Sequence, residues 1–232
     1  MKSSKAQLDK RGLLNDADYL AYCIDFKTID SLISSQNAQD RTAAFRFLKY
    51  NKSSTYLPKL CEVLINEKCL YTKIELCETI SVFELEALPY LDKLIGMIGK
   101  NQHNKIGLYD IGKKGFPLPR DIVSRIIVNM KEDALSWFKE RIRKYDIKKL
   151  REVVDIIGHL TFYSHNKCLE DELIDIYNTT KDDIVKWKIV KAFQAFESDE
   201  IIRILSKLLN SDNEIMKIEA KRSIERIKTK SA

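Results

Sequence analysis

The residues best suited to chemistry lie in a segment rich in glycine and proline, which runs from Asn104 to Ile122 and reads NKIGLYDIGKKGFPLPRDI. Its GKKG run places two ammonium groups beside backbone N–H groups, at dihedral angles that glycine permits, and this combination suits a phosphate or carboxylate group. The candidate binding residues of the segment are Lys105, Tyr109, Gly112, Lys113, Lys114, Gly115, Phe116 and Arg120.

The composition of this segment leaves two interpretations open. Ile106, Leu108, Tyr109, Ile111, Phe116 and Leu118 are too many apolar side chains for a solvated linker, so we expect the segment to fold back onto the rest of the protein. Pro119 fits the first turn of the following helix, whose free amides would add to an anion site. In the alternative, the segment only covers an apolar edge, and Asp110 and Asp121 partly cancel its positive charge.

Residue patterns of known catalytic and metal sites are missing from the sequence. It contains no HExxH, P-loop, GxSxG or CxxC motif, and His103, His159 and His165 are scattered. His165 and Cys168 offer two zinc ligands where a structural site needs four. We therefore predict no catalytic residues, no metal and no cofactor. A non-enzymatic protein is favoured, while enzymatic activity remains the alternative.

Positive charge is concentrated in two segments of a chain whose formal net charge is +6. Lys139 to Arg151 carries seven bases against two acids, and Lys217 to Lys230 carries six against two. An anionic partner would meet such patches rather than a uniformly basic surface. The candidate phosphate contacts are Arg141, Arg143, Lys144, Lys148, Lys149 and Arg151.

The bulk composition predicts an all-α protein. Seven glycines and four prolines among 232 residues leave little material for the many tight turns of a sandwich or barrel. No apolar run approaches the ~18 residues that a bilayer span needs, and the N-terminus lacks the apolar core of a secretory signal. We therefore expect a cytoplasmic protein without membrane contact, and five cysteines that act as reduced, mostly core-packed thiols.

A repeat of about 30 residues runs through the helical pattern. Each unit has an amphipathic first helix, as in Leu57, Leu60, Cys61 and Leu64, followed by a basic residue that opens a second amphipathic helix. Stacked pairs of this kind share one continuous core. The basic landmarks are Arg41, Lys73, Arg120, Lys149, Lys188 and Lys217.

In this pattern the chain resembles the HEAT-like repeat family. Asp183 with Lys188, and Asp212 with Lys217, match its turn residue and basic helix start. The resemblance implies one domain over 1–232, an α-α superhelix (solenoid) of about six helix pairs, with one long ordered insertion at about 100–118 in the third pair. The landmarks would then tie neighbouring repeats through acidic partners, an interpretation favoured over a cationic stripe. We also expect Trp187 to be buried rather than to serve a contact surface.

The fold resemblance favours a non-enzymatic scaffold that binds a protein or peptide through the solenoid surface and the insertion. The alternative is a nucleic-acid-binding protein similar to the HEAT-like alkylpurine DNA glycosylases, although the tryptophan-rich site of that family is not matched around Trp137 or Trp187. Resemblance to deoxyhypusine hydroxylases fails because none of the three histidines is followed by glutamate. Nothing specific supports the phycobilin lyase subunits, and the oligomeric state stays open.

Overall fold

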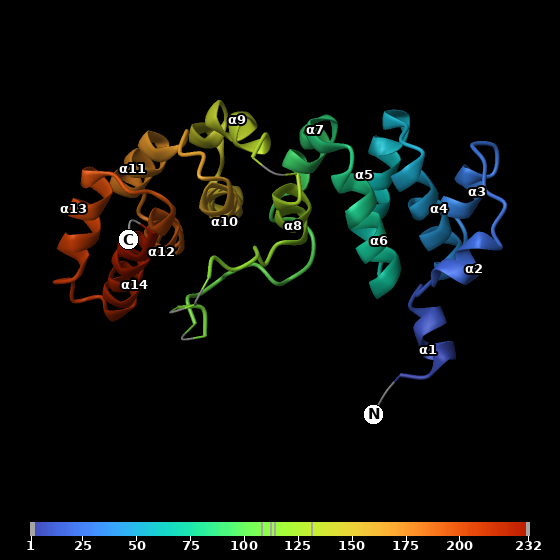
Figure 1. The fold of residues 1–232 in the computed structure, drawn as a ribbon, viewed down its shortest axis with the longest axis horizontal. Helices are drawn as coiled ribbons and strands as arrows, with labels where there is room; N and C mark the ends of the chain where they lie inside the picture. The colour runs from blue at the N-terminus through green and yellow to red at the C-terminus, as the bar shows by residue number, and fades with distance from the viewer. Residues whose placement is uncertain (1–2, 108, 112, 114, 131, 231–232) are drawn as a thin grey trace. The chain divides into compact units, whose positions relative to one another are not determined.

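The computed structural model describes residues 3–107, 109–111, 113, 115–130 and 132–230, and all of its regular structure in these ranges is helical (Figure 1). The predicted all-α class is thereby confirmed. The chain groups into two compact units, Met1–Lys93 and Leu94–Ala232. None of the helices in the described ranges combines the length and apolar character that crossing a membrane requires. The predicted Gly112 and Lys114 contacts lie outside the described residues.

The first unit is built around the packing of two central helices. Helix α4 contacts both α3 and α6, and α5 packs on α6. Apolar side chains such as Phe45, Leu60 and Leu76 are buried between them. The helices are α1 (Lys5–Lys10), α2 (Asp16–Leu20), α3 (Ile29–Ile33), α4 (Ala38–Tyr50), α5 (Leu57–Asn66), α6 (Leu70–Ser81) and α7 (Leu88–Leu91).

In the second unit, alternate helices pack on one another in chain order. Helix α8 contacts α10, α10 contacts α12, and α12 contacts α14, while α11 and α13 pack on the helices that follow them. Side chains of Asp121, Asp146 and Asp182 cap α8, α10 and α12 by accepting from a backbone N–H of the first turn. The helices are α8 (Ile122–Val128), α9 (Ala134–Lys139), α10 (Ile147–Ser164), α11 (Glu170–Thr179), α12 (Asp183–Ala192), α13 (Asp199–Leu208) and α14 (Glu214–Lys230).

Ion pairs within each unit recur at about the predicted repeat length. Arg41 contacts Glu67 at 2.8 Å, Lys59 contacts Asp30 at 2.6 Å, and Lys167 contacts Glu197 at 3.1 Å. The members of these pairs are 26, 29 and 30 residues apart in the chain. Residues about one predicted repeat length apart in the chain therefore lie side by side within each unit.

The predicted role of the basic landmarks holds at two positions and differs at two others. Arg41 pairs with Glu67 in the turn between α5 and α6, and Lys188 on α12 pairs with Glu152 on α10. Lys217 instead pairs with Glu214 of its own helix, and Arg120 pairs with Asp110, ten residues earlier in the same segment. A recurring basic position therefore did not identify a single kind of partner.

A cluster of four buried charges joins α10 to α12. Lys188 Nζ lies 3.1 Å from Glu152 Oε1 and 2.7 Å from Asp155 Oδ2, and Lys191 Nζ lies 2.5 Å from Asp155 Oδ1. Burial alone would raise the pKa of Asp155, but the two ammonium groups hold that pKa well below its usual range. Burial raises the pKa of Glu152 above its ordinary value, against the opposing effect of Lys188.

Two helix boundaries before and after the insertion differ from the sequence-based expectation. The helical spacing of Leu88, Leu91, Leu94, Ile95 and Ile98 in the sequence predicts a helix through all five residues, but α7 ends at Leu91, and a 3-10 turn (Asp92–Leu94) follows. Gly96 then adopts a φ of 74°, which ends helical geometry. Pro119 does not enter a first helical turn, because Asp121 caps α8 and the helix begins at Ile122.

Replacing Asp155 by Asn should destabilise the protein by about 3–5 kcal/mol, because Lys191 would lose its only carboxylate among the described residues and stay buried. The measurement is chemical denaturation at neutral pH. As a matched control, Asp175→Asn removes the exposed partner of Arg143 and should cost less than about 1 kcal/mol. Equal losses in the two variants would contradict a special role for the buried cluster.

Candidate functional site

The insertion folds back onto the second unit, as its apolar content predicts. Phe116 is only 3% exposed, and its ring lies against α10. Arg222 of α14 donates hydrogen bonds to the carbonyl groups of Lys113 and Gly115, the latter at 3.0 Å. The hydroxyl of Tyr163 donates to the Phe116 carbonyl at 3.3 Å. In Figure 1 the segment between α7 and α8 accordingly passes α10 and extends toward α14.

A glycine in the middle of α10 makes room for this anchor. A Cβ atom at Gly158 would lie well inside van der Waals distance of Phe116 Cζ and 2.9 Å from Ala192 Cβ. Glycine lowers the stability of a helix interior by up to about 1 kcal/mol relative to alanine. Its presence here is explained by the close approach of the insertion to α10 and α12.

A cavity of about 220 Å³ opens between the insertion and helices α10 and α12. We call it the insertion pocket. Its lining combines three cations, two carboxylates, one imidazole and four apolar or aromatic side chains. The residues are His103, Tyr109, Asp110, Lys113, Pro117, Leu118, Arg120, Asp155, Trp187 and Lys191.

His103 is the polar group of the insertion pocket that lacks a normal partner. It is only 6% exposed, and neither ring nitrogen forms a hydrogen bond with the described residues. Its Nε2 atom lies 3.4 Å from Asp110 Oδ1, too far for a well-formed hydrogen bond, and its ring meets Trp187 edge to face at 5.1 Å. Burial, together with Lys188, lowers the pKa of His103 to about 4, so the ring is neutral near pH 7.

The inner wall of the insertion pocket is held by a hydrogen-bonded chain that reaches the insertion. Trp187 Nε1 donates to Glu219 at 3.2 Å, and Arg222 donates to the same carboxylate at 2.6 Å. Arg222 in turn holds the carbonyl groups of Lys113 and Gly115. The predicted burial of Trp187 is confirmed, and its indole ring forms one wall of the pocket.

The outer edge of the insertion pocket is apolar and exposed. Tyr109 is 89% exposed and Leu118 is 58% exposed, and both line the pocket. Asp110 between them accepts from the Gly107 N–H at 3.0 Å and from Arg120. These contacts hold the pKa of Asp110 below its usual value, although burial alone would raise it. Two large apolar side chains are therefore presented to solvent by a segment that is fixed from behind.

The structure brings some predicted binding residues together and separates others. Tyr109, Lys113 and Arg120 line the insertion pocket, and Phe116 lies behind it as an anchor. Lys105 lies elsewhere, in a cavity of about 500 Å³ that Arg151 also lines. The carbonyl group of Gly115 accepts from Arg222, so that peptide is engaged with α14.

Several predicted phosphate contacts are already paired with carboxylates. Arg143 binds Asp175, and Arg151 Nε lies 3.1 Å from Asp182 Oδ1. Arg141 lies 2.9 Å from Glu140 and 3.7 Å from the centroid of the Trp137 ring. Lys149 lies 5.0 Å from the centroid of the Tyr145 ring. Lys144 and Lys148 are exposed and extend the basic surface.

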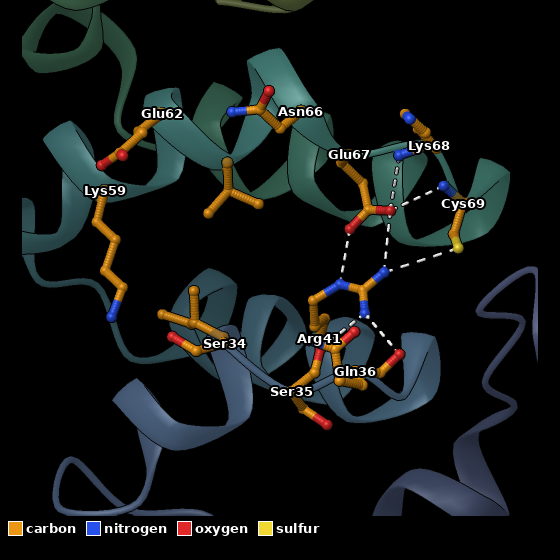
Figure 2. A pocket seen from close by; sticks show the side chains of 12 residues that line it. Ser34, Ser35, Gln36, Arg41, Lys59, Glu62, Asn66, Glu67, Lys68 and Cys69 are labelled. Atoms are coloured by element: carbon orange, nitrogen blue, oxygen red, sulfur yellow. Dashed lines mark hydrogen bonds and ion pairs between the residues drawn. The ribbon is translucent and has the colours of Figure 1, made fainter.

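The first unit contains a different cavity of about 630 Å³, in which Arg41 and Glu67 bind each other (Figure 2). Arg41 donates to both carboxylate oxygens of Glu67, at 2.8 and 3.1 Å, and to the Ser35 carbonyl at 2.8 Å. Glu67 also accepts from the N–H of Cys69 at 2.8 Å. This arrangement joins α4 to the turn between α5 and α6, which explains these charges without a ligand.

Sequence reasoning missed most of the polar lining of the insertion pocket. Asp155 and Lys191 lie on helix faces that are otherwise apolar. The available signal was the three-residue spacing of Glu152 and Asp155 in one helix and of Lys188 and Lys191 in the other, which places each pair on one face. His103 belongs to no recognisable sequence motif, and only the folded insertion brings it to Trp187.

The chain matches no protein-family model, and no curated protein matches it significantly.

Replacing Gly158 by Ala should displace the insertion, because its Cβ atom would overlap the Phe116 ring. We expect a loss of about 1–3 kcal/mol and faster amide exchange in the insertion. Hydrogen exchange read by mass spectrometry measures both effects. The double variant G158A/F116L offers more space and should recover part of the loss, whereas no recovery would show that Phe116 is not the group in conflict.

Protein stability should fall as the pH drops from 6.5 toward about 4, the interval between the unfolded and folded pKa values of His103. In this interval the unfolded chain binds a proton that the buried ring resists, so unfolding is favoured by about 3 kcal/mol at the acidic end. Denaturation series over this range should show a smaller loss for His103→Gln. Burial also lowers the pKa of His159, so His159→Gln should likewise reduce the loss of stability at acidic pH. Parallel pH profiles for wild type and His103→Gln would contradict the assignment.

Proposed function

We propose that this protein is a non-enzymatic binding scaffold built from HEAT-like helix pairs, and that a protein or peptide docks over the insertion. The observation that carries the proposal is the exposed apolar edge of the insertion pocket, formed by Tyr109 and Leu118. Exposed aromatic and aliphatic side chains beside a pocket are typical of interaction sites. We expect a cytoplasmic location, where buried thiols such as Cys61 stay reduced.

The anchoring of the insertion supports recognition by this segment. Ordering a loop on binding lowers affinity, so a segment already fixed by Phe116 and Arg222 binds at a smaller entropic cost. The exposed ring of Tyr109 thus belongs to a segment whose backbone is already held at Gly107 and Gly115 before a partner binds. The repeat-length spacing of ion pairs supports the HEAT-like description, because equivalent residues of successive helix pairs meet in such folds.

Nucleic-acid binding is the second candidate, supported by the exposed Lys144 and Lys148 in the basic segment. It is the weaker one, because Arg143 and Arg151 are engaged by Asp175 and Asp182. A phosphate contact by either arginine would first have to displace a carboxylate. Electrostatic binding of duplex DNA would also weaken steeply with rising salt, which gives a direct means to tell the two candidates apart.

Selection of a random peptide library on the purified protein should yield binders that need the apolar edge. We expect Tyr109→Ala combined with Leu118→Ala to weaken the selected peptides at least about tenfold, with little change in thermal stability because both side chains are exposed. Calorimetric titration measures the affinity. Ile202→Ala combined with Ile218→Ala removes comparable exposed apolar groups from α13 and α14 and should leave it unchanged.

Two outcomes would overturn the scaffold proposal. One is a library that yields no binders sensitive to the Tyr109 and Leu118 changes. The other is tight, salt-sensitive binding of duplex DNA that is lost on replacing Lys144 and Lys148 by Gln, since this would favour the nucleic-acid alternative.

A further inference from the structure

The insertion pocket contains features that an apolar docking edge alone does not require. Behind Tyr109 and Leu118 the lining changes from apolar to charged, and the imidazole of His103 lies among these charged groups. A peptide that only packed against the edge would leave this polar interior unused. The chemistry of the interior therefore bears on which part of a partner enters it.

The first observation is the lack of a hydrogen-bond partner for His103. Buried polar side chains are nearly always hydrogen-bonded, because an unpaired donor or acceptor away from water is costly. This ring is more than nine-tenths buried, lines the pocket, and has no such partner among the described residues. A group entering the pocket can supply one.

The second observation is the balance of charge around the pocket. Lys113, Arg120 and Lys191 face two carboxylates, those of Asp110 and Asp155, so the lining is positive when the imidazole is neutral. Asp155 is also shared by two ammonium groups, which leaves it little capacity to attract a further cation. Arg120 donates to Asp110 through one nitrogen, and a guanidinium carries five N–H donors in all.

The third observation concerns which anion the pocket can hold. A volume of about 220 Å³ is suited to a single side chain rather than an extended ligand. Three cations against two carboxylates leave the lining with a single net positive charge, which a singly charged carboxylate balances and a doubly charged phosphate would exceed. The exposed ring of Tyr109 and side chain of Leu118 lie where an apolar neighbour of that carboxylate would pack.

We propose that the insertion pocket receives an Asp or Glu side chain of the bound peptide, with Arg120 and Lys113 contacting the carboxylate and His103 completing its hydrogen bonds. An apolar residue next to the acidic one packs against Tyr109 and Leu118. This inference rests on the proposed binding function and specifies the partner as an acidic peptide segment with an apolar flank.

The test uses the peptides selected on the full-length protein. An Asp or Glu should recur at one position beside an apolar residue, and its replacement by Asn or Gln should weaken calorimetric binding at least about tenfold. Arg120→Gln should weaken binding of the acidic peptide to the same extent. It should leave unchanged the affinity for the amidated peptide, in which Asn or Gln replaces the acidic residue. Lys148→Gln, which removes an exposed positive charge from α10 outside the pocket lining, is the matched control and should have no effect.

A second readout separates direct contact from a structural effect of these variants. NMR titration of the His103 ring should show its pKa rising when the acidic peptide is bound, because a nearby carboxylate favours the imidazolium. The amidated peptide should leave that pKa where it is. A phosphoserine peptide should bind more weakly than the glutamate peptide.

The inference is overturned if the selected peptides carry no acidic position, if amidation leaves their affinity unchanged, or if the phosphoserine form binds more tightly. Peptides that still depend on Tyr109 and Leu118 in those cases would leave the scaffold function standing. Loss of that dependence as well would remove both proposals. An unchanged His103 pKa in a saturated complex would exclude the imidazole from the contact.

Discussion

The pairing of two lysines on α12 with two carboxylates on α10 is the interaction on which the second unit depends. Four buried charges are tolerated only where each meets an opposite charge at hydrogen-bonding distance, because desolvation costs several kcal/mol per ion. Glu152 and Asp155 are three residues apart, as are Lys188 and Lys191, so the two pairs match along neighbouring helices. A shift of one helix along the other would leave buried charges without partners, and the cluster therefore favours a single register.

That register also places the wall of the insertion pocket. Lys191 and Trp187 share a face of α12, where the ammonium group lies 4.8 Å from the centroid of the indole ring and 5.4 Å from that of Phe116. The insertion is then held at two further points, by the space at Gly158 and by Arg222 of α14. A segment with little regular structure of its own acquires a defined position because the helices beneath it are fixed first.

The two units use charge in different ways. In the first unit the Arg41–Glu67 pair joins a helix to the turn beyond the next helix, and both members of this pair line the cavity beside it. In the second unit the charges of the insertion pocket are only partly matched, and one imidazole has no hydrogen-bond partner in the described structure. This difference is the reason why recognition is proposed at the insertion. The positive charge of the basic segment Lys139 to Arg151 is also partly neutralised, because carboxylates from α11 and the start of α12 pair with two of its arginines.

The sequence by itself determined the helical class and the return of the insertion onto the helices, because periodic apolar residues and scarce glycine are local properties of the chain. The repeat near 30 residues remains a prediction from the sequence, with which the spacing of the ion pairs agrees. It also predicted the burial of Trp187 and three of the residues that line the insertion pocket. It did not predict that, of the six apolar residues expected to fold the insertion back, Phe116 is buried while Tyr109 and Leu118 are exposed. Nor did it indicate that His103 meets Trp187, 84 positions away in the numbering. Only the tertiary structure decided these points, since contacts between segments far apart in the chain depend on the register of packed helices, which no local pattern records.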